Sequence, residues 1–126
     1  MQKREAIRYF ENAKKILSNT AIEDNIYADI KPVQEACSTA YLAVLKAIDE
    51  YLLKKGLTKK ELPQSIDAYK AALKKHLAVH NGKLTKEFEV LYDELHIAGY
   101  YRGLHLNANI IKEIFKAARN FIEKIK

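Results

Sequence analysis

Cysteine, proline and glycine are scarce in this chain, and each scarcity excludes a class of structure. The 126 residues contain one cysteine, two prolines, four glycines and no tryptophan. A single cysteine cannot form an internal disulfide, so a disulfide-stapled secreted domain is excluded and a reducing compartment is expected. The few glycines and prolines argue against a turn-rich β protein and against disorder.

Long apolar runs are also lacking. No stretch approaches the ~18 uncharged apolar residues of a membrane span, and the first residues are charged where a signal peptide would be apolar. We therefore expect a cytoplasmic protein without membrane contact. The net charge of +6 comes from 22 basic and 16 acidic residues. This mild excess permits RNA or nucleotide binding without requiring it, since lysines scattered over helix surfaces serve solubility equally well.

Apolar residues recur with helical spacing in five segments. These segments cover residues 2–18, 31–55, 64–79, 83–98 and 107–125. No segment alternates with period two over the length of a strand, and short connections force neighbouring helices to run antiparallel. The sequence therefore predicts one domain over residues 1–126, an all-α, antiparallel up-and-down bundle of about five helices.

Local signals mark several boundaries of these segments. Asn19 is expected to end the first helix, and Thr20 with Glu23 matches a capping box that predicts a short helical turn. Pro32 suits the first turn of the second helix, where its missing N–H is not needed. Gly56 can adopt the left-handed conformation that ends a helix.

The segment over 31–55 is apolar around more than half of its circumference. We expect it to be the central helix, with neighbours on two sides. Cys37 and Tyr41 lie on its apolar stripe, where a buried thiol behaves as a small apolar residue and not as a nucleophile. Leu42 and Leu53 widen the stripe beyond what a monomer is expected to cover, which predicts a homodimer that buries both.

The most unusual stretch is residues 99–105, Gly-Tyr-Tyr-Arg-Gly-Leu-His. Gly99 and Gly103 are expected to let the backbone turn between the last two helices. The amides at the start of the following helix would then point toward the same corner, where they favour an anion.

The side chains of this corner are the candidate ligand-binding residues. Tyr100 and Tyr101 offer ring faces and hydroxyls, and Arg102 can hold a phosphate or carboxylate through two hydrogen bonds. The alternative is a packed corner, in which the tyrosines close the end of the bundle and Arg102 caps carbonyls of the preceding helix.

The other histidines give weaker signals. His76 and His80 are four residues apart, a spacing that can hold a metal, but no third ligand lies nearby in sequence. We therefore predict no metal site there, and an exposed pair near a helix end. His96 could act as a general base, although such a histidine is more often half-buried and hydrogen-bonded to backbone. No motif in the chain indicates a cofactor.

Residues 36–56, ACSTAYLAVLKAIDEYLLKKG, resemble the long helix of HEPN domains. Those domains also place an arginine in a short break before a C-terminal amphipathic helix, as Arg102 is placed here. A group of short, uncharacterised bacterial proteins of HEPN-like type shares Ala-Cys-x-Thr-Ala-Tyr, here at 36–41. The group also shares Leu-His-x-x-Gly-Tyr-Tyr-x-Gly, here at 95–103. The resemblance covers residues 31–125 and implies an HEPN-like bundle.

The resemblance also implies two alternative functions. Many HEPN proteins are metal-independent ribonucleases whose Arg and His are separated by a longer spacer and paired across a dimer. Here only Gly103 and Leu104 separate Arg102 from His105, so the chain looks more like the HEPN members that bind or dimerise, some beside a nucleotidyltransferase.

The leading prediction is therefore a non-catalytic binding or dimerising module. Its nucleotide or phosphate ligand would lie at Tyr100, Tyr101, Arg102 and His105. The alternative is a metal-independent ribonuclease of HEPN type with a degenerate Arg102/His105 site, acting across a dimer.

Overall fold

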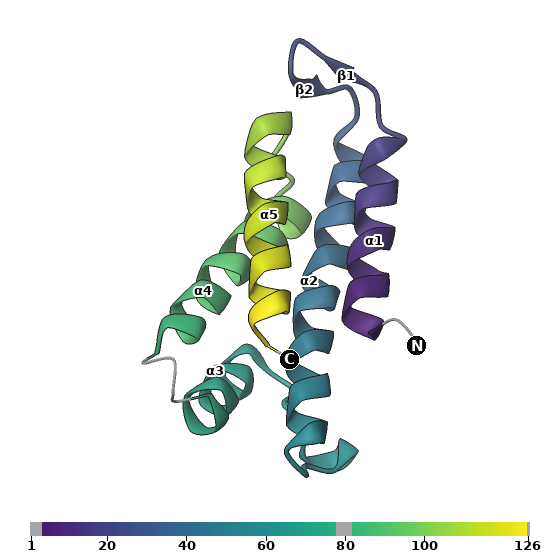
Figure 1. Ribbon diagram of the computed structural model, residues 1–126. Coiled ribbons are helices and arrows are strands. Elements are labelled where there is room, and N and C mark those ends of the chain that lie inside the picture. Colours follow the sequence, from purple (N-terminus) through teal and green to yellow (C-terminus); the bar gives the residue numbers. More distant parts are fainter. Residues whose placement is uncertain (1–3, 78–81, 126) are drawn as a thin grey trace.

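The computed structural model describes residues 4–77 and 82–125. Within these ranges the chain forms five α-helices, which confirms the predicted all-α bundle (Figure 1). They are α1 (Glu5–Ser18), α2 (Ile30–Lys54), α3 (Ile66–His76), α4 (Lys83–Leu91) and α5 (Ala108–Lys124). Four further elements join them: strands β1 (Ile22–Glu23) and β2 (Ile26–Tyr27), a 3₁₀ turn η1 (Lys59–Glu61), and a π-helix η3 (Tyr92–Tyr101).

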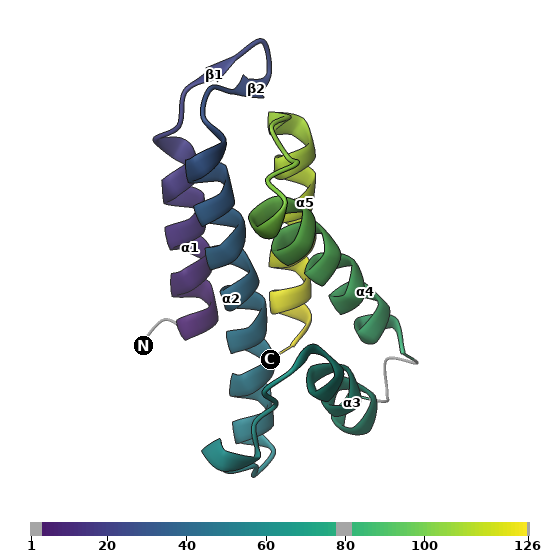
Figure 2. The same cartoon turned by 180° about the vertical axis from the view of Figure 1, so that it is seen from behind.

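The helix α2 is the centre of the bundle, as its wide apolar arc predicts. It contacts α1, η3, α5 and α3. Figure 1 shows α1 running antiparallel to α2, and α5 running in the same direction as α2 on its other side. Seen from behind in Figure 2, α4 runs obliquely and leads up into the π-helix beside α5. The described part of the chain has no helix with the length and apolarity that crossing a bilayer requires.

The apolar stripes of the helices meet in one core. Small residues on α2 let the flanking helices approach it, and large aliphatic and aromatic side chains from the other helices fill the remaining volume. The largest fully buried side chains are Phe88, Phe121, Ile48, Leu52, Leu73, Leu95, Ile111, Ile122, Ile125, Val33, Val44 and Cys37.

The two ends of the described chain meet beside α2 (Figure 1). Arg4 precedes α1, and its guanidinium donates hydrogen bonds to the carbonyl oxygens of Ile122 and Ile125, at 3.3 and 2.8 Å. The Arg4 side chain therefore provides a donor for the Ile125 carbonyl and a second donor for the Ile122 carbonyl, which also accepts from Ile125 N at 3.3 Å.

The segment after α1 corrects one prediction, the helical turn over 20–23. The chain instead forms an antiparallel hairpin of β1 and β2, with Asp24 and Asn25 at its tip in the left-handed region (φ 50° and 66°). Asp and Asn tolerate these angles better than other non-glycine residues. The Thr20 hydroxyl donates to the Ile16 carbonyl of α1 at 3.0 Å, so it caps no new helix.

The hairpin is tied to the segment that leads into α5. Tyr27 N donates to Leu106 O at 2.8 Å, and Ala108 N donates to Asn25 O at 2.9 Å. These bonds join parts of the chain about eighty positions apart in sequence and close the upper end of the bundle over α1, α2 and α5.

The fourth predicted helix, over 83–98, differs in length and form. It continues past Leu91 without a break as the π-helix η3, which ends at Tyr101. Gly99 was expected to turn the backbone, which is wrong, because it lies inside η3. A Cβ at Gly99 would stand 2.6 Å from Cys37 Sγ, so this glycine permits close packing on α2. Gly103 (φ 58°) makes the turn. The expected end of the third helix, near residue 79, lies outside the described residues.

Candidate functional site

The two sequence motifs at 36–41 and 95–103 contact each other in space. Gly99 of η3 lies directly against Cys37 of α2, and burial raises the pKa of that thiol to about 12. The Gln34 side chain, one turn earlier on α2, donates from Nε2 to the Tyr100 carbonyl oxygen at 2.9 Å. Gly103 leaves room for Gln34, since a Cβ there would stand 2.8 Å from Nε2. The α2 helix thus fixes the end of η3 at two points.

An aromatic row leads from the core to this corner. Tyr41 of α2 stacks on His96 of η3, with ring centroids 4.9 Å apart, and His96 stacks on Tyr100 at 5.9 Å. Tyr92 packs beside the row, 5.4 Å from His96. Tyr92, His96 and Tyr100 are spaced four residues apart on η3, and each ring contacts the next one along the helix. Burial, with a contribution from Tyr92, raises the pKa of Tyr41 to about 12.

His96 therefore differs from both roles that the sequence suggested. It is half-buried, but rings surround it and its imidazole makes no hydrogen bond with another described residue. Its role in this structure is to connect Tyr100 to the core through stacking.

Tyr100, Tyr101 and Arg102 form the corner surface, which we define by these three residues. Tyr100 is 44% exposed and Tyr101 75% exposed, and Arg102 is also exposed. Backbone bonds fix the corner: Arg102 N donates to Ile97 O at 2.8 Å, and Leu104 N donates to Ala98 O at 2.9 Å. The end of η3 is thus closed by backbone, and the Arg102 guanidinium has no partner among the described residues.

His105 is separated from this surface. Its side chain is only 14% exposed, and Nε2 is buried 3.1 Å from Glu94 Oε2 on η3. The two atoms lie within ion-pair distance but are not aligned for a hydrogen bond. The structure therefore brings Tyr100, Tyr101 and Arg102 together at the surface and turns His105 inward. Glu94 is a partner that sequence reasoning missed.

The start of α5 also differs from expectation. Its first-turn amides were expected to favour an anion at the corner, which is wrong for two of them. Asn107 Oδ1 accepts from Asn109 N at 2.9 Å and from Ile110 N at 3.1 Å. Asn25 Nδ2 donates to the same oxygen at 3.3 Å, so this side chain caps α5 and holds the hairpin.

The metal interpretation of the histidines rests partly on a residue outside the described ranges. His76 ends α3, whereas His80 lies among the residues that the structure does not describe. Within residues 4–77 and 82–125, no group of three His, Cys, Asp or Glu side chains is placed to hold a metal ion.

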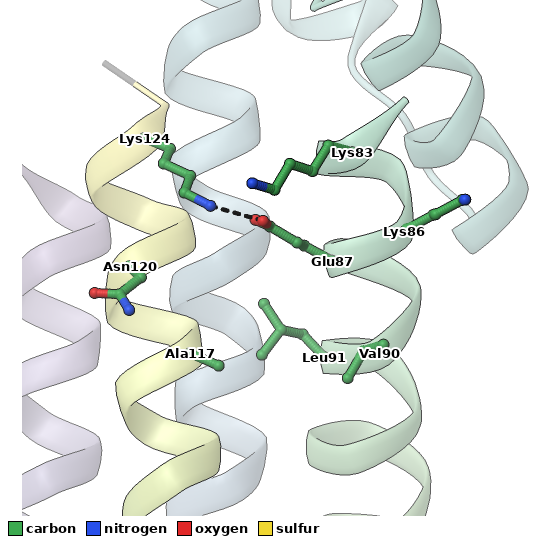
Figure 3. A pocket seen from close by; sticks show the side chains of 8 residues that line it. All are labelled: Lys83, Lys86, Glu87, Val90, Leu91, Ala117, Asn120 and Lys124. Atoms are coloured by element: carbon green, nitrogen blue, oxygen red, sulfur yellow. Dashed lines mark hydrogen bonds and ion pairs between the residues drawn. The ribbon is translucent and has the colours of Figure 1, made fainter. Parts of the chain in front are cut away.

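Two hollows lie on α5, away from the corner surface. A cleft of about 360 Å³ separates α4 from α5, and Figure 3 shows Glu87 reaching across it to Lys124, with Nζ and Oε1 2.6 Å apart. A larger groove of about 1070 Å³ runs between α1, the hairpin and α5. Sequence reasoning missed its lysines, although the i, i+4 spacing of Lys112 and Lys116 was a signal that could have indicated them.

These features define a class of protein, an all-α helical bundle whose long central helix fixes a π-helical corner. The chain belongs to the family described as Domain of unknown function (DUF5618), whose model matches residues 1–126.

A solved structure is similar to this chain over most of its length. The chain is similar to a protein of unknown function from Dyadobacter fermentans, with 34% identity over 96% of this chain and 90% of that chain, and a TM-score of 0.78. No curated protein matches the chain.

Proposed function

We propose that this protein is a non-catalytic binding module that holds an anionic, phosphate-bearing ligand at the corner surface. The observation that carries the proposal is the Arg102 guanidinium, which is exposed and unpaired among the described residues. A guanidinium presents a planar fork of donors that matches a phosphate or carboxylate.

The neighbours of Arg102 suit a ligand that also carries a flat ring. Tyr100 and Tyr101, which directly precede it in sequence, present exposed ring surface. Gln34 holds the Tyr100 carbonyl, and backbone bonds hold Arg102 itself, so little order has to be gained on binding. A nucleotide combines a phosphate with a stacking base and fits this set of groups.

The ribonuclease alternative has weaker support. It requires His105 to move a proton on the substrate that Arg102 holds, and a general base must lie within hydrogen-bond reach of that proton. The His105 Nε2 atom is instead buried against Glu94. The geometry therefore favours binding without chemistry.

The test is a titration followed by amide NMR with adenosine monophosphate, inorganic phosphate and adenosine as probes. We expect adenosine monophosphate to shift the amides of residues 97–105 and to bind more tightly than phosphate or adenosine alone. The Arg102→Ala variant should weaken the binding about tenfold or more, because a hydrogen bond to a charged group contributes ~1.5–3 kcal/mol. Arg8→Ala is the matched control, since Arg8 is exposed on α1.

An unchanged spectrum over 97–105 at millimolar nucleotide would remove the proposal. Incubation of the wild type and Arg102→Ala with single-stranded and structured RNA tests the alternative in parallel. Cleavage by the wild type that Arg102→Ala abolishes would support a ribonuclease in place of a binding module.

We propose further that two copies associate through α2 as a homodimer. Leu42 and Leu53 are 43% and 40% exposed and lie three turns apart on the same face of α2. Light scattering of the wild type and of Leu42→Lys/Leu53→Lys tests this. A monomeric wild type at micromolar concentration would contradict it.

The same proposal includes a relationship to the HEPN-like proteins. It also includes a cytoplasmic location and a protein partner such as a nucleotidyltransferase. It is supported by the packing of the 36–41 motif against the 95–103 motif, both of which the resemblance rests on. A pull-down with the corner variant Arg102→Ala beside the wild type would show whether the partner uses the same surface as the nucleotide.

A further inference from the structure

A second concave site lies between α1, the hairpin and α5. Figure 1 shows α1 and α5 on either side of α2, antiparallel to each other, with the hairpin above them. The groove between them has a volume of about 1070 Å³. This is at the upper end of the range for small-molecule pockets, ~300–1,000 Å³. None of the corner-surface residues lines it.

Aromatic side chains and the hairpin line the two ends of the groove. At the lower end, the rings of Phe10 and Phe115 meet with centroids 5.8 Å apart, and the Arg119 guanidinium lies over Phe10 at 5.8 Å. At the upper end, Ile22 and Tyr27 of the hairpin line the wall. A concave groove of this volume matches a small ligand.

The interior of the groove is apolar. Its accessible apolar surface comes from the half-buried Leu17 and Ala108 and from Ile22, which is 52% exposed, whereas Phe10, Tyr27, Ile111 and Phe115 of the lining are buried. Such a surface favours contact with a hydrocarbon group of a ligand over contact with water.

The rim of the groove is cationic. Lys14 from α1 and Lys112 and Lys116 from α5 are exposed and have no partner among the described residues. Arg119 adds a fourth positive charge, although its Nε donates to Glu123 Oε1 at 2.9 Å, and Glu113 is the acidic residue of the lining.

The positive electrostatic potential of the groove comes from its lysines and not from the end of a helix. Lys112 and Lys116 are four residues apart on one helix face, where like charges repel each other. An anion between them would relieve this repulsion. The first-turn amides of α5 contribute little, because Asn107 already occupies two of them.

We infer that this groove binds an anionic amphiphile, a carboxylate or phosphate headgroup joined to a hydrocarbon tail. The tail lies on Leu17, Ile22 and Ala108, and the headgroup pairs with Lys14, Lys112 and Lys116. The ligand is a free monomer and not a lipid within a bilayer, because the groove is concave whereas a membrane surface is flat.

The experiment measures binding of dodecanoate below its micellar concentration by calorimetry and amide NMR. Acetate and inorganic phosphate supply the charge without the tail, dodecanol supplies the tail without the charge, and dodecylammonium reverses the charge. We expect dodecanoate to bind with one-to-one stoichiometry and to shift amides in the hairpin and the first half of α5. Dodecanol should bind at least about tenfold more weakly, and acetate, phosphate and dodecylammonium should show no saturable binding.

Two variants separate the headgroup from the tail. Lys112→Ala/Lys116→Ala removes two charges from exposed positions and should weaken dodecanoate binding about tenfold while leaving dodecanol binding unchanged. Ile22→Asp places a carboxylate at the rim and should weaken both ligands. The matched control is Lys59→Ala/Lys60→Ala on η1, which removes two exposed lysines far from the groove. Circular dichroism verifies that each variant is folded.

Equal binding of dodecanoate by the wild type and by Lys112→Ala/Lys116→Ala would overturn the inference. Co-flotation with anionic phosphatidylglycerol vesicles, without saturable binding of monomeric dodecanoate, would also overturn the inference. The lysines of the groove would then bind a membrane surface instead of a free ligand. The Arg102→Ala variant should bind dodecanoate normally, so failure here and failure of the nucleotide proposal are distinguishable.

Discussion

Gly99 and Cys37 make the tightest backbone approach at the candidate corner. A Cβ at position 99 would stand 2.6 Å from Cys37 Sγ, 2.9 Å from Cys37 Cβ and 2.9 Å from the Glu94 carbonyl oxygen. No side chain larger than hydrogen fits without movement of α2 or η3. Because η3 carries Tyr100 and Tyr101 and leads directly into Arg102, this contact sets where the corner surface lies relative to α2.

The Gly99→Ala variant should lower the free energy of unfolding by about 1–3 kcal/mol, because the added methyl overpacks the contact. Urea denaturation measures the loss. In a double-mutant cycle, Cys37→Ala should offset part of it, giving a coupling of about 0.5–3 kcal/mol.

The control for this cycle is Gly82→Ala. Gly82 has a positive φ of 74°, and no atom lies within 4 Å of the place that an added methyl would take, so its cost comes from the backbone alone. Its effect should simply add to that of Cys37→Ala. A Gly99→Ala variant as stable as the wild type would show that η3 adjusts freely.

Single residues show what the sequence could reveal about the corner. Tyr100, Tyr101 and Arg102 are consecutive, so any turn at this place exposes some of them together. His105 was grouped with them because it is close in sequence. Its contact with Glu94 depends on the helical geometry of η3, which the sequence did not reveal. Cys37 was predicted to be buried from its place on the apolar stripe, and this is confirmed.

At the scale of elements, Asn107 joins a helix to a hairpin. Its Oδ1 atom accepts from two amides of α5 and from Asn25 at the tip of the hairpin. Neighbouring backbone bonds hold Tyr27 and Ala108 in the same arrangement. The hairpin is therefore stabilised largely by its bonds to the start of α5, since a two-stranded ribbon of this length is marginal on its own.

The Asn107→Ala variant should lose about 0.5–2 kcal/mol of stability, the usual cost of removing an N-cap. Hydrogen exchange should accelerate most at the amides of residues 109 and 110 and of the hairpin. Asn107→Asp keeps an acceptor at this position and should behave like the wild type. Asn109→Ala, two residues further on, serves as the control. Faster exchange in α5 without any change in the hairpin would contradict the coupling.

How well an element could be predicted depends on its length and on the regular spacing of its apolar residues. Helices α1, α2 and α5 carry long apolar stripes and were predicted within a few residues of their described ends. The strands β1 and β2 have two residues each, too short for an alternating pattern to be visible. The π-helix was missed because a window tuned to the α-helical period sees residues 92–98 as a continuation of α4.

At the scale of the whole molecule, burial of tyrosine hydroxyls and of the Cys37 thiol makes the free energy of unfolding depend on pH. Burial raises the pKa of Cys37 from 9.0 to about 12 and that of Tyr41 from 10.0 to about 12. It also raises the pKa of Tyr27 and of Tyr69, whose hydroxyl donates to Asp49 at 2.9 Å. The folded state therefore holds these protons more tightly than the unfolded state does.

Alkaline unfolding should follow from these shifts. The contribution of the raised pKa values is complete below pH 9.0, the ordinary value of the thiol, and is lost as the pH rises through the folded values near 12. Circular dichroism should show cooperative loss of helix in this window, together with tyrosinate absorbance. Cys37→Ala should move the midpoint to higher pH. Complete tyrosine ionisation before any loss of helix would contradict the expectation.

The bonds from Arg4 to Ile122 and Ile125 have a consequence for synthesis in the cell. They span 118 and 121 positions, so they can form only after residues 4–125 have left the ribosome. Until then α1 and α2 can associate, but the face that α5 covers stays in contact with water. A nascent chain therefore exposes apolar surface of α1 and α2 until α5 has emerged from the ribosome.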